Sequence, residues 1–207
     1  MRTDKVELNG TDLGVTEALE ESERFCDYAG VSGKAAIHVR LLTEEALGMV
    51  RGILGEQSAQ FWLESVQGEG KRLCRICITV NTTVNYDLRE ALLSVSSSGK
   101  NAAAVGIVGK IREIIEIGLR GFDDVSRIQT QDGLYGTDFI AMGLMDLNDS
   151  AEDCWWSLDN YKEQVSEAPE SGEAWDELEK SVVSRLADEV RVGIRSGRVD
   201  LVVEKQI

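Results

Sequence analysis

The chain has 207 residues, of which 43% are hydrophobic and 29% charged, a composition typical of a globular protein with a sizeable core. The formal net charge of −15 disfavours nucleic acid as a partner, because duplex binding draws most of its affinity from neutralising phosphates. No apolar run reaches the roughly 18 residues of a membrane span, and the N-terminal stretch MRTDKVELNG lacks the apolar core of a signal peptide. We therefore expect a cytoplasmic protein that does not associate with membranes.

One strand signal and two helix signals follow each other over residues 5–54. KVELNG predicts a short strand, and residues 15–30 predict a helix that stops at Gly30. A second helix, capped by Ser32, is expected over residues 33–54, because apolar residues recur there every three or four positions. The residues expected on the core faces are Val15, Leu19, Phe25 and Tyr28 in the first helix, and Ile37, Leu41, Leu42, Ala46, Val50 and Ile53 in the second.

A β-hairpin is expected next, because AQFWLESV and KRLCRICITV are β-rich runs joined by the glycine-containing turn QGEG. In the second run Cys74, Ile76, Ile78 and Val80 are expected to share one face. Cys74 and Cys77 have the CxxC spacing of zinc and redox sites, but positions three apart on a strand point to opposite faces. We therefore interpret both cysteines as structural.

The remaining elements complete an α+β pattern. Helices are expected over residues 86–95 and from about Asn101 to Leu119, and a glycine-punctuated irregular segment begins at Gly121. A helix resumes near residue 174, and VRVGI–RSGR–VDLVVEK predicts a closing hairpin. The apolar residues of that helix are Leu178, Val182, Leu186 and Ala187. This order predicts a two-layer sandwich, with a mainly antiparallel sheet and helices on one face.

The acidic excess is concentrated in residues 146–180, which also hold the only proline. This segment is either a solvated acidic face or a docking surface for a basic partner. The pair Trp155-Trp156, near Tyr161, is either a partner-binding patch or a plug that packs against the sheet. We predict that residues 121–173 form an acidic insertion in a domain built from residues 1–120 and 174–207.

Residues 95–111, VSSSGKNAAAVGIVGKI, contain two glycine–lysine pairs that suggest a phosphate-binding loop. The P-loop pattern GxxxxGK[ST] requires a glycine five positions earlier and a hydroxyl residue after the lysine. At those two positions lie Ser94 and Asn101 for Gly99-Lys100, and Ala104 and Ile111 for Gly109-Lys110. Neither pair forms a P-loop.

The order of elements resembles the histidine-kinase-like (Bergerat) ATPase fold, and most of all its anti-sigma-factor serine-kinase branch. The resemblance rests on VELNG, a helix ending in RFCDYAG, a helix carrying LLTEEALGMV and the hairpin that follows, and it covers roughly residues 5–120. It implies a bacterial-type regulatory protein with a pocket for ATP or ADP.

The motifs of that family correspond to residues that differ from its usual pattern. A helical glutamate activates the attacking water and an asparagine four residues later holds magnesium, and the resemblance places Glu45 and Met49 at these positions. Because a thioether is a poor ligand for a hard, oxygen-preferring cation, usual magnesium binding is not expected. The Asp-x-Gly-x-Gly that binds adenine corresponds to NTTVN, where Asn81 still offers an amide oxygen but both glycines are absent.

The family's third motif, a glycine-rich lid that leads into a helix, corresponds to SSSGKNAAAVGIVGKIREII. The resemblance implies an anion site here, at a helix N-terminus. Its candidate nucleotide-binding residues are Gly99, Lys100, Asn101, Gly106, Gly109 and Lys110. The two glycines inside the helix, Gly106 and Gly109, are explained either by close packing against the sheet or by close approach of a phosphate.

The resulting expectation is a regulatory protein with a protein partner and a degenerate nucleotide pocket, in which Glu45 is the one catalytic candidate and enzyme activity is not favoured. The first alternative is a functional ATP-binding protein or anti-sigma-like serine kinase with Glu45 as its base. A more remote alternative is an unrelated α+β domain whose acidic segment binds a basic protein. The single histidine, His38, has no nucleophile near it in the sequence and is interpreted as structural.

Overall fold

The computed structural model describes residues 1–9, 12–54, 58–67, 71–81, 111, 154–167, 178–195 and 198–207. The chain divides into two compact units. Unit 1 contains Met1–Asn81, Val182–Arg191 and Asp200–Ile207, and unit 2 contains Thr82–Ser181 and Val192–Val199. The helices expected over residues 86–95 and 101–119, apart from the helical residue Ile111, lie outside the described residues, as does most of the segment 121–173.

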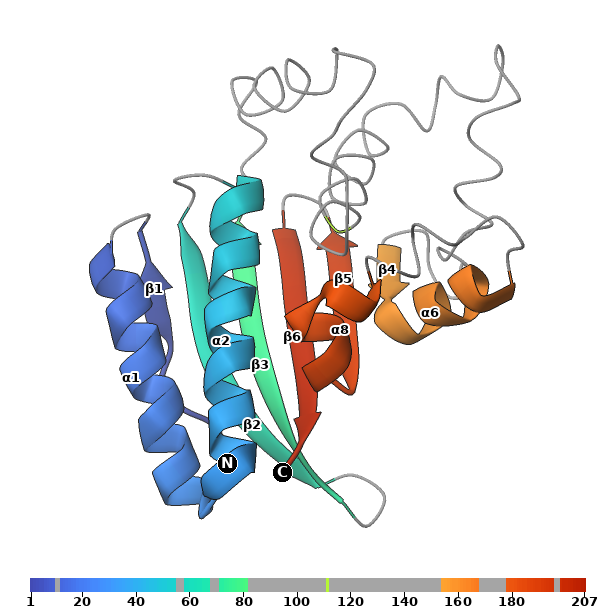
Figure 1. The fold of residues 1–207 in the computed structure, drawn as a ribbon. Coiled ribbons are helices and arrows are strands. Elements are labelled where there is room, and N and C mark those ends of the chain that lie inside the picture. The colour runs from blue at the N-terminus through green and yellow to red at the C-terminus, as the bar shows by residue number, and fades with distance from the viewer. Residues whose placement is uncertain are drawn as a thin grey trace. The chain divides into compact units, whose positions relative to one another are not determined.

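The six strands form one sheet in the order β1-β2-β3-β6-β5-β4 (Figure 1). Their bounds are β1 Val6–Leu8, β2 Ala59–Gln67, β3 Arg72–Asn81, β4 Cys154–Ser157, β5 Glu189–Arg195 and β6 Arg198–Gln206. Strand β2 pairs antiparallel with both β1 and β3, and Phe61 lies opposite Ile78 in the β2–β3 hairpin. The first strand and both expected hairpin pairs of strands are therefore confirmed.

Helices α1 (Asp12–Ala29), α2 (Gly33–Leu54) and α8 (Val182–Leu186) lie on one face of the sheet (Figure 1). Together with the antiparallel strands they confirm the predicted α+β fold. The helix expected to resume near residue 174 is interrupted at Ser181, between the helical residues 178–180 and α8. Among the described residues, no helix has the length and apolar character needed to cross a membrane.

The core of unit 1 lies between this helix layer and the sheet. The strand residues that face the helices alternate along β2 and β3, as the pattern predicts, and are fully or almost fully buried. They are Ala59, Phe61, Leu63, Cys74, Ile76, Ile78 and Val80. The helices contribute Ala18, Phe25, Cys26, Val39, Leu42, Ala46, Leu47 and Met49.

Three of the residues expected in the core are instead exposed to solvent. Tyr28 is 81% exposed, Ile37 58% and Leu41 38%. Each helix has apolar residues on more than one side, so the periodicity allows more than one choice of core stripe. On α2 the buried stripe runs through Val39, Leu42, Ala46 and Met49, which turns Ile37 and Leu41 outward.

The turn from α1 to α2 has the backbone geometry that a helix stop requires. Gly30 has a φ of 64°, a left-handed conformation that glycine adopts without the steric cost of a Cβ. Its N–H donates to the carbonyl of Asp27, and the N–H of Val31 donates to the carbonyl of Cys26. These two bonds form a Schellman motif and confirm that the first helix ends at Gly30.

In unit 2, β4 leads directly into α6 (Leu158–Glu167). Trp156 is 2% exposed, and its ring centroid lies 5.9 Å from that of Tyr161. Leu158 and Val165 are buried on the same short helix. Trp156 therefore belongs to the packing of unit 2, and the partner-patch interpretation does not apply to this side chain.

Candidate functional site

Helix α2 carries the positions that the resemblance assigns to the catalytic base and the metal ligand. Glu45 is exposed, whereas Met49, one turn later, is 2% exposed and packs in the core between α2 and the sheet. The carboxylate of Glu45 thus reaches solvent. The thioether of Met49 is buried and offers no oxygen to a cation.

Asn81, the candidate for adenine binding, is the last residue of β3 and is exposed. The other candidate pocket residues, Gly99, Lys100, Asn101, Gly106, Gly109 and Lys110, lie outside the described residues. The described part of the predicted nucleotide site therefore consists of Glu45 and Asn81.

The sheet face that points away from α1 and α2 carries polar side chains that no motif predicts. The pairs that lie opposite each other on this second face are Gln60 and Thr79, Trp62 and Cys77, and Glu64 and Arg75. Next to them, the hydroxyl of Thr79 donates a 2.6 Å hydrogen bond to Oδ1 of Asp200, and both residues are buried. Strand β6 therefore continues the polar face that β2 and β3 begin.

Five charged residues alternate in sign across this face, and we call them the charged row: Arg2, Glu64, Arg75, Glu204 and Arg191. Arg2 Nε lies 3.5 Å from Oε1 of Glu64. Arg75, opposite Glu64, donates from Nε to Oε1 of Glu204 over 2.7 Å, and Arg191 donates to the same oxygen. Glu204 thus lies between two guanidinium groups and Glu64 pairs with that of Arg2, so both carboxylates of the row are paired with arginines.

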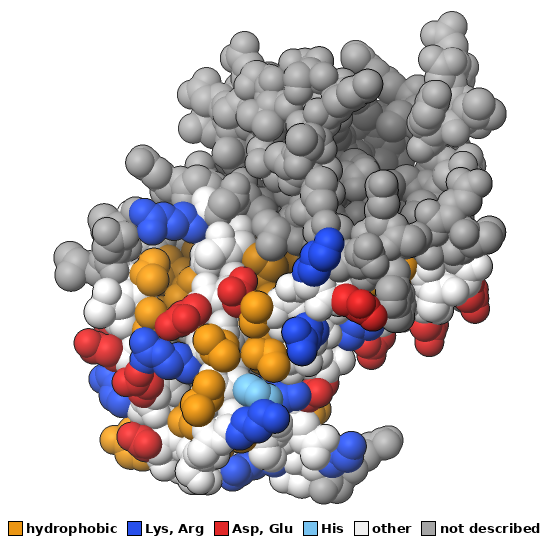
Figure 2. Space-filling model, in the orientation of Figure 1, with side chains coloured by type: hydrophobic (Ala, Val, Ile, Leu, Met, Phe, Trp, Pro, Cys, Tyr) orange, Lys and Arg blue, Asp and Glu red, His pale blue; other side chains and the backbone are white. Residues whose placement is uncertain are grey.

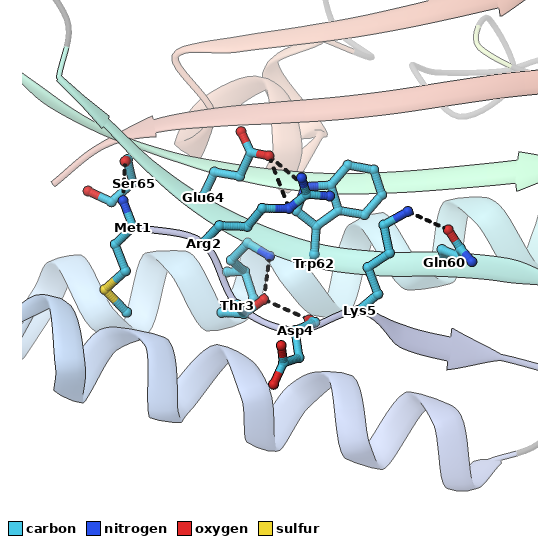
Figure 3. Close-up of polar contacts among 10 residues, drawn as sticks. Met1, Arg2, Thr3, Asp4, Lys5, Gln60, Trp62, Glu64 and Ser65 are labelled. Carbon is cyan, nitrogen blue, oxygen red and sulfur yellow. Dashed lines mark hydrogen bonds and ion pairs between the residues drawn. The ribbon is translucent and has the colours of Figure 1, made fainter.

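Trp62 lies beside the charged row and holds the N-terminal segment on β2 (Figure 3). The guanidinium carbon of Arg2 is 4.8 Å and Nζ of Lys5 is 5.0 Å from its ring centroid. The indole N–H donates to Glu64 over 2.8 Å, and Lys5 donates to the side chain of Gln60 over 2.6 Å. These cation–π contacts and hydrogen bonds create a half-buried aromatic surface with charged edges.

The two cysteines of the CxxC lie on opposite faces of β3, as predicted. Cys74 faces the helices opposite Ser65, and Cys77 lies opposite Trp62 on the other face. Neither forms a disulfide. Burial raises the pKa of Cys74, and the neighbouring thiols of Cys26 and Cys77 raise it further.

Cys77, on the second face of the sheet, is also buried. Burial first and then the carboxylate of Glu64 raise the pKa of Cys77 to about 12. At neutral pH these thiols are protonated, which makes them poor nucleophiles and poor metal ligands. Within the described part of the chain, no group of three or more His, Cys, Asp or Glu side chains is placed to hold a metal ion.

We expect the free energy of unfolding to decrease as the pH rises above about 9, because unfolded thiols ionise near 8.5 while folded Cys77 stays protonated. The pKa of the thiol is higher in the folded state than in the unfolded state. The stabilisation that comes from this difference is therefore complete below the unfolded pKa and is lost as the pH approaches the folded pKa. Each pH unit in that window costs about 1.4 kcal/mol per buried thiol. Urea denaturation at pH 7.5, 9.0 and 9.8 measures how steeply the free energy of unfolding falls with pH, and Cys77→Ala should make this slope smaller. An equal slope in that variant would contradict the prediction.

Sequence patterns miss the charged row because its members come from five separate segments. Strand alternation does place Trp62 and Glu64 on one face, and Arg75 and Cys77 on one face of the next strand. It does not show that β6 lies beside β3, which is what brings Glu204 to Arg75.

Comparisons with protein-family models, curated proteins and solved structures found no significant match to this chain.

Proposed function

We propose that this protein is a regulatory protein that acts by binding another protein, on a scaffold related to the histidine-kinase-like ATPases in which the nucleotide pocket is degenerate. The observation that carries this proposal is that Met49, on α2, is buried in the core. At the position where the family holds magnesium, this chain has an apolar side chain that is used for packing. A cytoplasmic location and a bacterial-type origin belong to the same proposal.

Two further observations support this proposal, one for the scaffold and one for the partner. The hairpin β2–β3 packs beneath the helix layer, with α2 against β3, which is the arrangement that the resemblance requires and an unrelated domain does not. Most of the net negative charge of the chain belongs to unit 2, which favours a partner with a basic surface. Such a partner would be attracted at long range, with an association rate that falls as salt is added.

A second candidate function is a working ATP-binding protein or serine kinase. The observation that favours it is the exposed carboxylate of Glu45, which lies on α2 where the resemblance places the catalytic base. This function needs magnesium ligands from another part of the chain, because Met49 supplies none.

Calorimetric titration of the full chain with ATP and ADP, with and without magnesium, separates the two functions. We expect no magnesium-dependent increase in ATP affinity and no turnover, in the wild type and in Glu45→Gln alike. Magnesium-enhanced ATP binding, with turnover abolished by Glu45→Gln, would contradict the proposal and establish the second candidate. Glu44→Gln is the matched control, because Glu44 is the adjacent exposed carboxylate on the same helix.

A further inference from the structure

The outer edge of β2 is covered by two successive segments that differ in geometry. Strand β1 pairs with the first part of β2, where Val6 lies opposite Phe61. Further along, Thr3 donates from its N–H to the carbonyl of Leu63 and accepts on Oγ1 from the N–H of Leu63, both over 3.0 Å. Between these two contacts the chain advances by two residues on β2 and by three on the N-terminal segment, which is the register slip of a β-bulge. The bulge separates residues 1–4, which we call the strap, from β1.

The strap adds no side chain to the core. None of its four side chains is buried, and the first buried residue of the chain is Val6. Met1 and Ser65 exchange two main-chain hydrogen bonds, 2.7 and 3.1 Å long, and Arg2 forms a partly exposed ion pair with Glu64 (Figure 3). An exposed ion pair contributes little to stability, and a segment without buried apolar contacts opens at low cost. The strap can therefore leave β2 while β1, held by Val6, stays in place.

Opening of the strap frees a stretch of the β2 edge that has its own binding chemistry. The main-chain groups of Leu63 and Ser65 that the strap pairs then face no other strand, which makes this stretch a template for strand addition. Beside it, the carboxylate of Glu64 and the ring of Trp62 lose Arg2, whose guanidinium carbon lies 4.8 Å from the ring centroid. A carboxylate next to an indole ring is matched by an arginine or lysine side chain. The strap itself thus shows what the edge accepts, which is an extended backbone with a cation opposite Glu64.

We propose that the edge of β2 from Leu63 to Ser65 is the docking site for an extended, basic segment of a partner protein, which displaces the strap and adds to the sheet as a strand. The partner's backbone takes over the hydrogen bonds of the strap, and an arginine or lysine side chain replaces Arg2 beside Glu64 and Trp62. This inference rests on the proposed function, because it names the site and the chemistry of the partner that the protein binds. The strap lowers the affinity for that partner in proportion to the fraction of molecules in which it covers the edge.

Amide hydrogen exchange of the full chain, followed by NMR, tests whether the strap opens. We expect the amides of Leu63 and Ser65 to exchange at least about tenfold faster than that of Phe61, because the strap covers them and β1 covers Phe61. Arg2→Ala should accelerate both by about three- to tenfold, since it removes the ion pair and the cation–π contact. Exchange of all three amides at one rate would overturn the proposal.

An acetylated and amidated peptide of alternating arginine and threonine is the probe for the docking site. We expect it to shift the NMR signals of the Leu63 and Ser65 amides and of the Trp62 indole N–H, and a peptide with glutamate in place of arginine to shift none of them. Arg2→Ala should tighten peptide binding by the same factor by which it accelerates exchange, because both depend on the open fraction. Unequal factors, or shifts confined to other parts of the chain, would contradict strand addition at β2.

Arg24→Ala is the matched control. Arg24 is 55% exposed and Arg2 51%, and each forms an ion pair, that of Arg24 being with Glu21 on α1 at 3.0 Å. Helix α1 lies on the face of the molecule seen in Figure 2, where acidic and basic side chains are interspersed, and not at the strap. This variant should change neither the exchange of the β2 amides nor the affinity for the peptide.

Two further outcomes separate this inference from its alternatives. Protection of the Leu63 and Ser65 amides that rises with the concentration of the protein itself would identify a second copy as the occupant and overturn the proposal. Slow exchange at β2 would refute the docking site and leave the proposed binding role to another surface. Magnesium-dependent ATP turnover, by contrast, would contradict the proposed function without changing exchange at β2.

Discussion

Replacing Met49 with asparagine is expected to lower the free energy of unfolding by about 2–4 kcal/mol, because the change removes core packing and leaves a buried amide without a partner. Met49 is 2% exposed and lies in the stripe of α2 that faces the sheet. The substitution restores the amide that the ATPase family uses for magnesium. Its cost therefore reports whether the surroundings of this position are a dry core or a polar pocket.

Urea denaturation of Met49→Asn and Met49→Leu, each with and without magnesium, makes the comparison direct. Leucine conserves the volume and should cost less than about 1.5 kcal/mol. Magnesium should stabilise neither variant. If the asparagine variant were as stable as the leucine variant and gained stability from magnesium, the site would be a polar metal pocket, and the ATP-binding candidate would replace the proposed function.

Replacing Gly14 with alanine is expected to destabilise the fold by about 1–3 kcal/mol, because the added methyl group has no space between α1 and β1. A Cβ at Gly14 would lie 2.9 Å from the carbonyl oxygen of Glu7 and 3.2 Å from Cα of Leu8. Both are backbone atoms of β1, so relief requires the helix to move away from the strand and not a change of rotamer.

Gly48→Ala is the matched control for this prediction. Both glycines lie inside helices, but a Cβ at Gly48 meets open space, so alanine should raise the free energy of unfolding by up to about 1 kcal/mol. Thermal and urea unfolding measure both variants. Similar effects of the two substitutions would show that helix propensity, and not the contact with β1, decides the outcome at Gly14.

Helix α2 separates what local pattern predicts from what it leaves open. Its bounds, Gly33–Leu54, match the predicted range because the apolar period of a helix is a property of neighbouring residues. The same period identified Leu42 and Ala46 of the buried stripe, but Ile37 and Leu41 were wrongly assigned to the core. The sequence of the helix does not show which of its sides faces the sheet, because that depends on residues elsewhere in the chain.

The β2–β3 hairpin shows the opposite case, in which local pattern was sufficient. Alternation and a short turn predict both strands and the face shared by Cys74 and Ile76, because the two strands are adjacent in the sequence. The same alternation correctly separated Cys74 from Cys77, which removed the reason to expect a zinc or redox site. The nucleotide-site residues remain predictions, of which Glu45 and Asn81 have described positions.

By itself, the sequence determined β1, α1, α2 and the hairpins β2–β3 and β5–β6, because these depend on residues a few positions apart. It did not predict β4 and α6, which lie in the segment expected to be an acidic insertion. Only the tertiary structure decided that Met49 packs in the core and that Glu204 lies between Arg75 and Arg191. Both outcomes depend on which distant segments lie side by side, through the placement of β6 next to β3 and of α2 over the sheet. Long-range packing chooses among the several apolar and polar faces that local periodicity permits.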